Sequence, residues 1–130
     1  MKIKDEIIKI VILCSDFNLG NRLKEGINKE SNFFKQDTEI ILDMNDLNKF
    51  EHINLLIFLI DEKMSLKYCN FKRFYKCVER DISIDLDKCL VRNNYNNTSY
   101  EIGKKFDERA IAFSILFDYY TDLEKKGQRR

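Results

Sequence analysis

A chain of 130 residues is long enough for one domain with a sizeable core, because globular domains commonly contain roughly 100–150 residues. Apolar residues make up 44% of it and charged residues 35%, which is typical of a folded protein rather than a disordered one. With 23 Lys and Arg against 22 Asp and Glu, the chain has no net field to attract nucleic acid or an anionic membrane. We therefore expect a single domain over residues 1–124, a basic flexible tail over 125–130, and neither nucleic acid nor membrane as a partner.

The N-terminal segment and the cysteines favour a cytoplasmic location. The segment Met1–Ile12 carries acidic residues ahead of its apolar run and lacks the small-residue cleavage site of a signal peptide. The longest apolar run, Ile53–Ile60, is far shorter than the roughly 18–20 residues that cross a bilayer. The four cysteines show no C-x-x-C spacing, and we expect free, mostly buried thiols at Cys14, Cys69, Cys77 and Cys89.

Three apolar segments in the first half of the chain predict strands. Ile7–Cys14 and Ile53–Ile60 are nearly continuous in aliphatic residues, which is typical of strands covered on both faces in a parallel sheet. Thr38–Leu42 predicts another strand between them, and residues 43–52 are polar enough to hold at most a short helix. The strength of the Ile53–Ile60 pattern predicts that this strand is central in the sheet.

A helix is expected directly after the first strand. Ser15 or Asp16 can cap its start, and apolar residues recur at i, i+4 and i+8 as Leu19, Leu23 and Ile27. The order strand, tight turn, helix is the opening of a βαβ unit.

The second half predicts one strand and two helices. Between Asn70 and Arg80 the aromatic residues follow an amphipathic helical spacing. A weak alternation at residues 82–86 precedes a fourth strand at Lys88–Val91, and Arg92–Asn97 is rich in turn residues. Thr98 with Glu101 three residues later matches a capping box for a last helix.

The last helix carries two apolar faces. One stripe is expected to pack on the sheet, whereas Ile111 and Ile115 widen the apolar band and are the candidate partner-binding residues. Two alternatives stay open for the second face: packing within the domain, or self-association and binding of another protein. The stripe expected to face the sheet consists of Phe106, Ala110, Phe113, Phe117 and Tyr120.

Alternating strands and helices predict an α/β protein, a flavodoxin-like three-layer α/β/α sandwich with four to five mostly parallel strands. In such sheets ligands bind outside the carboxyl ends of the strands. The candidate ligand-binding residues at that edge are Cys14, Ser15, Asp16, Asp61, Glu62, Arg92 and Asn93.

Two alternatives stay open at that edge. The carboxylates of Asp16, Asp61 and Glu62 are either solvated and capping groups, with no cofactor, or weak ligands of Mg²⁺. The position of Cys14 before a helix could lower the pKa of its thiol, but the loop that follows offers no histidine base, so a buried inert thiol is the favoured interpretation.

The opening KIVILCSDFNLGNRLKEGI and the run NLLIFLID resemble the first strand, first helix and third strand of response-regulator receiver domains. In receivers the first strand ends in an acidic pair that binds Mg²⁺, and the third ends in the phosphoaccepting aspartate. Here these positions hold Cys14-Ser15 and Leu59, with Asp16 and Asp61 displaced by one and two residues. The resemblance implies a pseudo-receiver that does not carry out phosphotransfer.

Weaker resemblances lead to other functions. The segments IILDMNDL, LLIFLIDEKMS and KYCNFKRF are similar in layout to TIR domains, although Lys72 stands near the position of the glutamate that enzymatic TIR domains use to cleave NAD. The neighbourhood of Cys14 resembles phosphotransferase-system B domains without the Ser and Thr residues of their loop. We expect a non-catalytic signalling or protein-interaction module; the alternative is a TIR-like NAD- or nucleotide-binding protein or enzyme.

Overall fold

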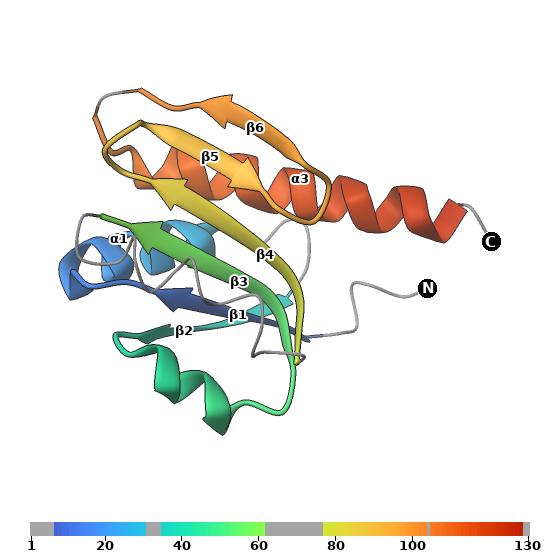
Figure 1. Cartoon of the computed structure of the whole chain (residues 1–130). Coiled ribbons are helices and arrows are strands. Elements are labelled where there is room, and N and C mark those ends of the chain that lie inside the picture. Colours follow the sequence, from blue (N-terminus) through green and yellow to red (C-terminus); the bar gives the residue numbers. More distant parts are fainter. Residues whose placement is uncertain (1–6, 31–34, 62–76, 104, 129–130) are drawn as a thin grey trace.

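The computed structural model describes residues 7–30, 35–61, 77–103 and 105–128 (Figure 1). Within them one sheet of six strands is accompanied by helices, which confirms the α/β class. The elements in chain order are β1 (Ile7–Leu13), α1 (Phe17–Lys29), β2 (Lys35–Ile41), the 3-10 helix η2 (Met44–Lys49), β3 (Ile53–Ile60), β4 (Val78–Asp85), β5 (Leu90–Asn93), β6 (Thr98–Glu101) and α3 (Glu108–Gln128).

The sheet is parallel on one side and antiparallel on the other. Its order is β2-β1-β3-β4-β5-β6. The pairs β1–β2, β1–β3 and β3–β4 are parallel, whereas β4–β5 and β5–β6 are antiparallel. The expected central position of Ile53–Ile60 is confirmed, and the expectation of mostly parallel strands is met in the first four strands only.

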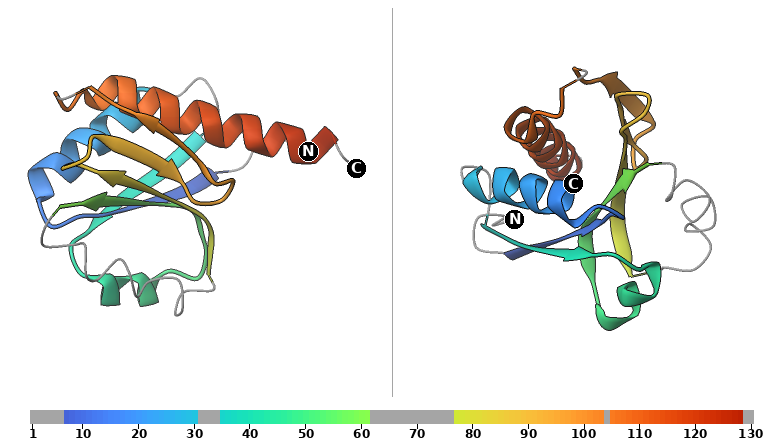
Figure 2. Two further views of the ribbon diagram at one scale, coloured as in Figure 1. Left: turned by 45° about the horizontal axis from the view of Figure 1, so that its top comes forward. Right: turned by 90° about the vertical axis from the view of Figure 1, so that its left-hand side faces the viewer.

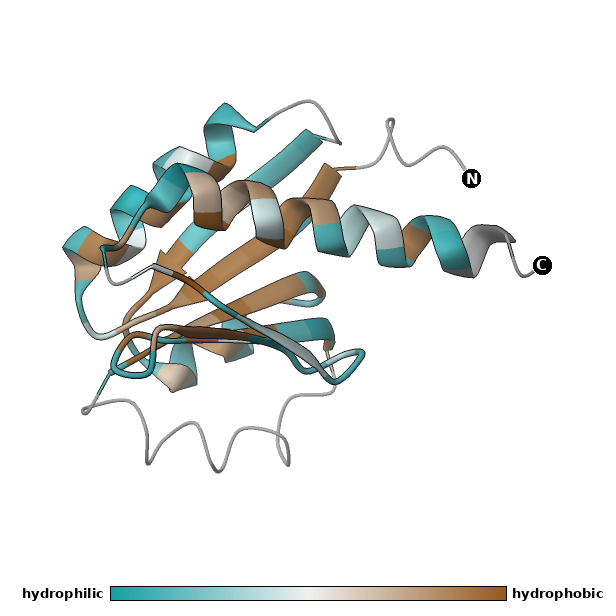
Figure 3. Ribbon diagram, turned by 90° about the horizontal axis from the view of Figure 1, so that it is seen from above, coloured by the Kyte–Doolittle hydropathy of each residue, from teal (hydrophilic) through white to brown (hydrophobic). Residues whose placement is uncertain are grey.

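Strands β1 and β3 bury side chains on both faces. Ile10 and Ile12 of β1 join one apolar cluster, whereas the alternate residues Val11 and Leu13 join a second one on the opposite face. The residues of β3 divide in the same way, because successive side chains of a strand point to opposite faces. Figure 3 shows these strands as largely hydrophobic, while the edge strand β2 is largely hydrophilic.

Helices α1 and α3 lie side by side on one face of the sheet, and η2 lies on the other (Figure 2). Asp16 caps α1, because its carboxylate accepts from the backbone N–H groups of Asn18 and Leu19. The two helices approach closely at Gly26, where an added Cβ would lie 2.7 Å from the backbone oxygen of Glu108. η2 contributes the fully buried Leu47 to the second cluster, in keeping with the short helix expected there.

The prediction of a helix at Asn70–Arg80 is wrong for the end of that range which the structure describes. Residues 78–80 begin strand β4, which continues to Asp85, and the remainder of the expected helix lies outside the described residues. The weak alternation at Ile82, Ile84 and Leu86 therefore marks the fourth strand. The parallel ladder with β3 gives this segment backbone partners and buries Ile82 and Ile84 against the helices, which outweighs the helical spacing.

The predicted fourth strand and capping box are also corrected. Lys88 and Cys89 lie in the turn between β4 and β5, where Cys89 has a φ of 52°, and the strand that follows is Leu90–Asn93. Thr98–Glu101 forms β6 instead of a helix start. The last helix is instead capped by Asp107, whose carboxylate accepts from the backbone N–H groups of Arg109 and Ala110. The helix continues to Gln128, so residues 125–128, which were expected to belong to a flexible tail, are helical.

The two faces of α3 differ in part from those expected: of the stripe expected to pack on the sheet, Phe106 and Tyr120 do pack against the helix-side core, but Phe113 and Phe117 do not. Ile111 and Ile115, the candidate partner-binding residues, are buried among the residues of the helix-side core, so they are not available to a partner. Phe113 and Phe117, expected to pack on the sheet, are 47% and 48% exposed. Their rings are stacked on each other, with centroids 5.9 Å apart.

No helix within the described part of the chain is long and apolar enough to cross a membrane.

The close approach of α1 to α3 predicts a measurable effect of a single methyl group. We expect Gly26→Ala to lower the free energy of unfolding by about 1 kcal/mol or more, because the collision with backbone atoms outweighs the gain in helix propensity. Urea denaturation followed by circular dichroism measures it. Gly103→Ala is the control, since an added Cβ there meets no atom within 4 Å, and it should change the stability by less than about 0.5 kcal/mol. Equal effects of the two substitutions would contradict the prediction.

Candidate functional site

The carboxyl ends of β1 and β3 bring four of the predicted site residues together. Cys14, Ser15 and Asp16 follow β1, and Asp61 follows β3, which is its parallel neighbour. The Ser15 hydroxyl donates a hydrogen bond to the carboxylate of Asp61, which links the segments that follow the two strands. Asp16 is turned toward the N-terminus of α1, where it accepts from the Asn18 N–H at 2.9 Å.

Cys14 is buried beneath this edge, with only 1% of its surface exposed. Burial raises the pKa of its thiol to about 11, and the charge of Asp16 acts in the same direction. A hydrogen bond from the Gly20 backbone to the thiolate opposes these effects without cancelling them. Because the thiolate is the nucleophilic form, Cys14 is unsuited to nucleophilic catalysis at neutral pH. This agrees with the inert thiol favoured from the sequence.

The depression at the carboxyl edge has no room even for a water molecule. Cys14, Ser15, Leu59, Asp61 and Leu86 are among the residues that close it. Among the described residues, no three Cys, His, Asp or Glu side chains are grouped as metal ligands would be. The arrangement joins the two loops by a side-chain hydrogen bond.

The other predicted site residues do not join this group. Because β5 runs antiparallel to β4, Arg92 pairs with Ser83 and Asn93 with Ile82, away from the edge where β4 ends. The prediction that Arg92 and Asn93 lie at the carboxyl edge is therefore wrong. Glu62 lies outside the described residues.

A second polar group, centred on Arg80, was missed by the sequence analysis. Arg80 of β4 is only 6% exposed, and its Nε donates to Asp122 of α3 at 2.9 Å. Its guanidinium also donates to Glu79 and lies over the rings of Tyr119 and Tyr95, with 5.3 Å and 5.9 Å to the centroids. The group attaches the second half of α3 to the sheet. The sequence gives no sign that Arg80 is buried, because the spacing of residues 70–80 predicts an amphipathic helix whose charged residues face solvent.

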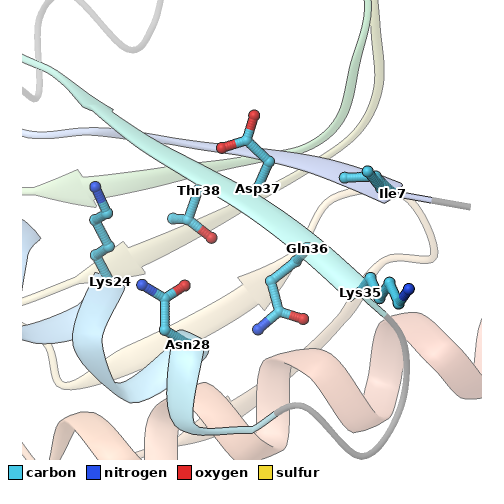
Figure 4. A pocket seen from close by; sticks show the side chains of 7 residues that line it. All are labelled: Ile7, Lys24, Asn28, Lys35, Gln36, Asp37 and Thr38. Carbon is cyan, nitrogen blue, oxygen red and sulfur yellow. The ribbon is translucent and has the colours of Figure 1, made fainter.

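A hollow of about 750 Å³ lies along the edge strand β2 (Figure 4). Lys24 and Asn28 of α1 and Thr38 and Gln36 of β2 point into the space between helix and strand, while Asp37 points to the other side of β2. Gln36 donates to the backbone oxygen of Ile27 at 2.5 Å. The side chains that line the hollow include both hydrogen-bond donors and hydrogen-bond acceptors. Such a lining suits the binding of a polar ligand more than the catalysis of a reaction.

Comparisons with models of protein families, with curated proteins and with solved structures found no match to this chain.

The contact between Cys14 and α1 gives a test by a double-mutant cycle. A Cβ at Gly20 would lie 2.5 Å from the Cys14 Sγ, so we expect Gly20→Ala to destabilise the protein by about 1–3 kcal/mol. In a Cys14→Ala background the sulfur is absent, and the same substitution should cost at least about 1 kcal/mol less. Urea denaturation of the four variants measures the coupling. Additive effects would show that the thiol is not seated against this turn of the helix.

Proposed function

We propose that the protein is a non-catalytic interaction module built on a receiver-like domain. The observation that carries the proposal is the closed carboxyl edge. Where receivers bind Mg²⁺ and a phosphoryl group, this chain has a buried thiol of raised pKa and a hydrogen bond from Ser15 to Asp61. A closed edge supports neither phosphotransfer nor a TIR-like reaction in the same crevice.

The flavodoxin-like sandwich belongs to this proposal. The order β2-β1-β3-β4 agrees with the 2-1-3-4 order of flavodoxin-like sheets, and η2 lies on the face opposite to α1 and α3. The antiparallel β5 departs from that pattern. We also propose a cytoplasmic location, with which the free thiols of Cys14, Cys77 and Cys89 are in keeping.

The proposed contact surface is the outer stripe of α3, defined as Ala110, Phe113, Phe117, Tyr120 and Glu124, of which Tyr120 is partly buried against the helix-side core. Its spacing of three, four, three and four residues is the seam of a helix that packs against another helix. Two phenylalanines that are nearly half exposed give the stripe apolar area to bury. This stripe replaces the buried Ile111 and Ile115 as the partner-binding face.

The occupant that fits this stripe is α3 of a second copy, packed antiparallel. When the pair is centred at residue 115, Phe113 meets Phe117 of the second copy, and the small Ala110 meets the large Tyr120. Arg109, which lies 3.7 Å from Glu30 of the same copy, precedes the stripe, and Glu124 ends it; both are exposed. In this pairing they are offset by three residues, about 4.5 Å along the axis, which their long side chains can bridge. The net charge of +1 opposes self-association only weakly.

The first test concerns phosphotransfer. We expect incubation with acetyl phosphate and Mg²⁺ to leave the intact mass unchanged, because Leu59 occupies the acceptor position and the Asp61 carboxylate is engaged by Ser15. A sample without Mg²⁺ is the control. A stable adduct of one phosphoryl group that disappears in Asp61→Asn would show that the acceptor has shifted along the loop, and would overturn the non-catalytic assignment.

The second test concerns self-association. We expect the wild-type protein to dimerise and the Phe113→Glu/Phe117→Glu variant to weaken the dimer on the order of 100-fold, because it loses two buried aromatic side chains per copy. Sedimentation equilibrium measures the dimer, and circular dichroism verifies that the fold is kept. Leu42→Glu is the matched control, since Leu42 is 50% exposed and lies outside the stripe. A monomeric wild type, or a double variant that dimerises normally, would exclude a second copy as the occupant.

A further inference from the structure

Two large apolar side chains are exposed at the carboxyl edge of the sheet. Phe17 begins α1 and is 53% exposed, and Leu42 directly follows β2 and is 50% exposed. Neither belongs to the two apolar clusters of the described core. Figure 1 shows the start of α1 and the end of β2 at the same edge of the sheet. Both residues are therefore available to a partner, on a part of the molecule outside the outer stripe of α3.

The contact between α1 and β2 makes these two residues neighbours. A Cβ at Gly20 would lie 3.4 Å from the Ile40 Cγ2, so this turn of the helix rests on the strand. Phe17 precedes Gly20 by three residues, about 4.5 Å along the helix axis. Leu42 follows Ile40 by two residues, about 6.6 Å along the strand. Because α1 runs back from the carboxyl edge and β2 runs toward it, both displacements lead to one apolar patch at that edge.

The surroundings of this patch are acidic. The segments that meet there, residues 14–21, 41–46 and 59–61, contain no Lys, Arg or His. Their carboxylates are those of Asp16, Asp43, Asp46 and Asp61. In the ranges that the structure describes, no cation is paired with Asp16 or Asp43, and both are exposed. An apolar patch within a negative field is complementary to an apolar group flanked by cations.

We propose that this patch, Phe17 and Leu42 with the carboxylates of Asp16 and Asp43, binds a basic segment of another protein that carries an apolar anchor. The anchor packs on the two apolar side chains and removes their area from water. Lys or Arg residues on either side of the anchor meet the two carboxylates. A second copy is a poorer occupant, because two such patches facing each other would bring like charges together. The contact is separate from the dimer proposed for α3.

The full-length protein can be titrated with three end-blocked peptides by two-dimensional NMR. The probe GKKLFKKG carries the anchor and the cations, GEELFEEG keeps the anchor with the opposite charge, and GKKSSKKG keeps the cations without the anchor. We expect saturable binding of the probe, with the largest shifts in the backbone amides of residues 15–18 and 42–45. Each comparison peptide should bind at least about tenfold more weakly. Absence of saturable binding of the probe at millimolar concentration overturns the proposal, and so does equal binding of either comparison peptide.

The charge contribution is tested with a matched pair of double variants. Asp16→Asn/Asp43→Asn should weaken binding of the probe at least about fivefold, because it removes two negative charges while Asn still caps both helices. Glu51→Gln/Glu101→Gln makes the same change of net charge at exposed positions outside the patch, and it should bind the probe normally. Equal binding by the two folded double variants would show that the acidic surroundings do not recognise the probe.

The apolar contribution is tested in the same way. Leu42→Ser should weaken binding at least about threefold, whereas Ile7→Ser, at a 66% exposed position at the opposite end of the sheet, should leave it unchanged. Circular dichroism verifies the fold of each variant. If Leu42→Ser does not fold, the wild-type shifts decide, and shifts confined to residues outside 15–18 and 42–45 overturn the proposal. Phe113→Glu/Phe117→Glu should bind the probe normally whatever its effect on the dimer, so the two proposed contacts can fail separately.

Discussion

The parallel pairing of β1 with β3 is the constraint on which the rest of the structure depends. Both strands are apolar on both faces, with Ile12 opposite Ile57 in the register, so the sheet needs cover on each side. Helices α1 and α3 cover one face, and η2 supplies Leu47 to the other. The same pairing brings Ser15 and Asp61 to one edge, where their hydrogen bond joins the loops that follow the two strands.

The reversal of direction after β4 determines where polar chemistry lies in this protein. A parallel fifth strand would end at the carboxyl edge and add its last residues to the group around Asp61. The antiparallel β5 instead carries Asn93 away from that edge, toward Asp118 of α3. The β5–β6 hairpin and α3 thereby enclose a polar hollow, while the expected crevice is closed. Topology, more than residue type, separates the two regions.

The sequence predicts the continuous apolar strands and the first helix well, because their patterns come from local burial. Ile53–Ile60 has the predicted bounds, and Asp16 is one of the two residues expected to cap α1. The errors occur where two patterns compete. Thr98 and Glu101 satisfy a capping box, yet they form an edge strand because the hairpin supplies backbone partners from β5. The polar group around Arg80 and Asp122 joins positions 42 residues apart, a distance over which local spacing carries no information.

Helix α3 illustrates why two apolar faces could not be ranked from spacing alone. Either stripe satisfies a helical period, and the aromatic one has the larger area to bury. The deciding factor is the contact with α1. A Cβ at Gly26 would lie 3.4 Å from the Ala112 Cβ, so the two helices meet through small residues. Turning α3 to bury Phe113 and Phe117 would remove Ala112 from this contact and place bulky rings where the backbones approach. The close approach therefore selects the face with Ile111 and Ile115, and it leaves the aromatic stripe on the outside.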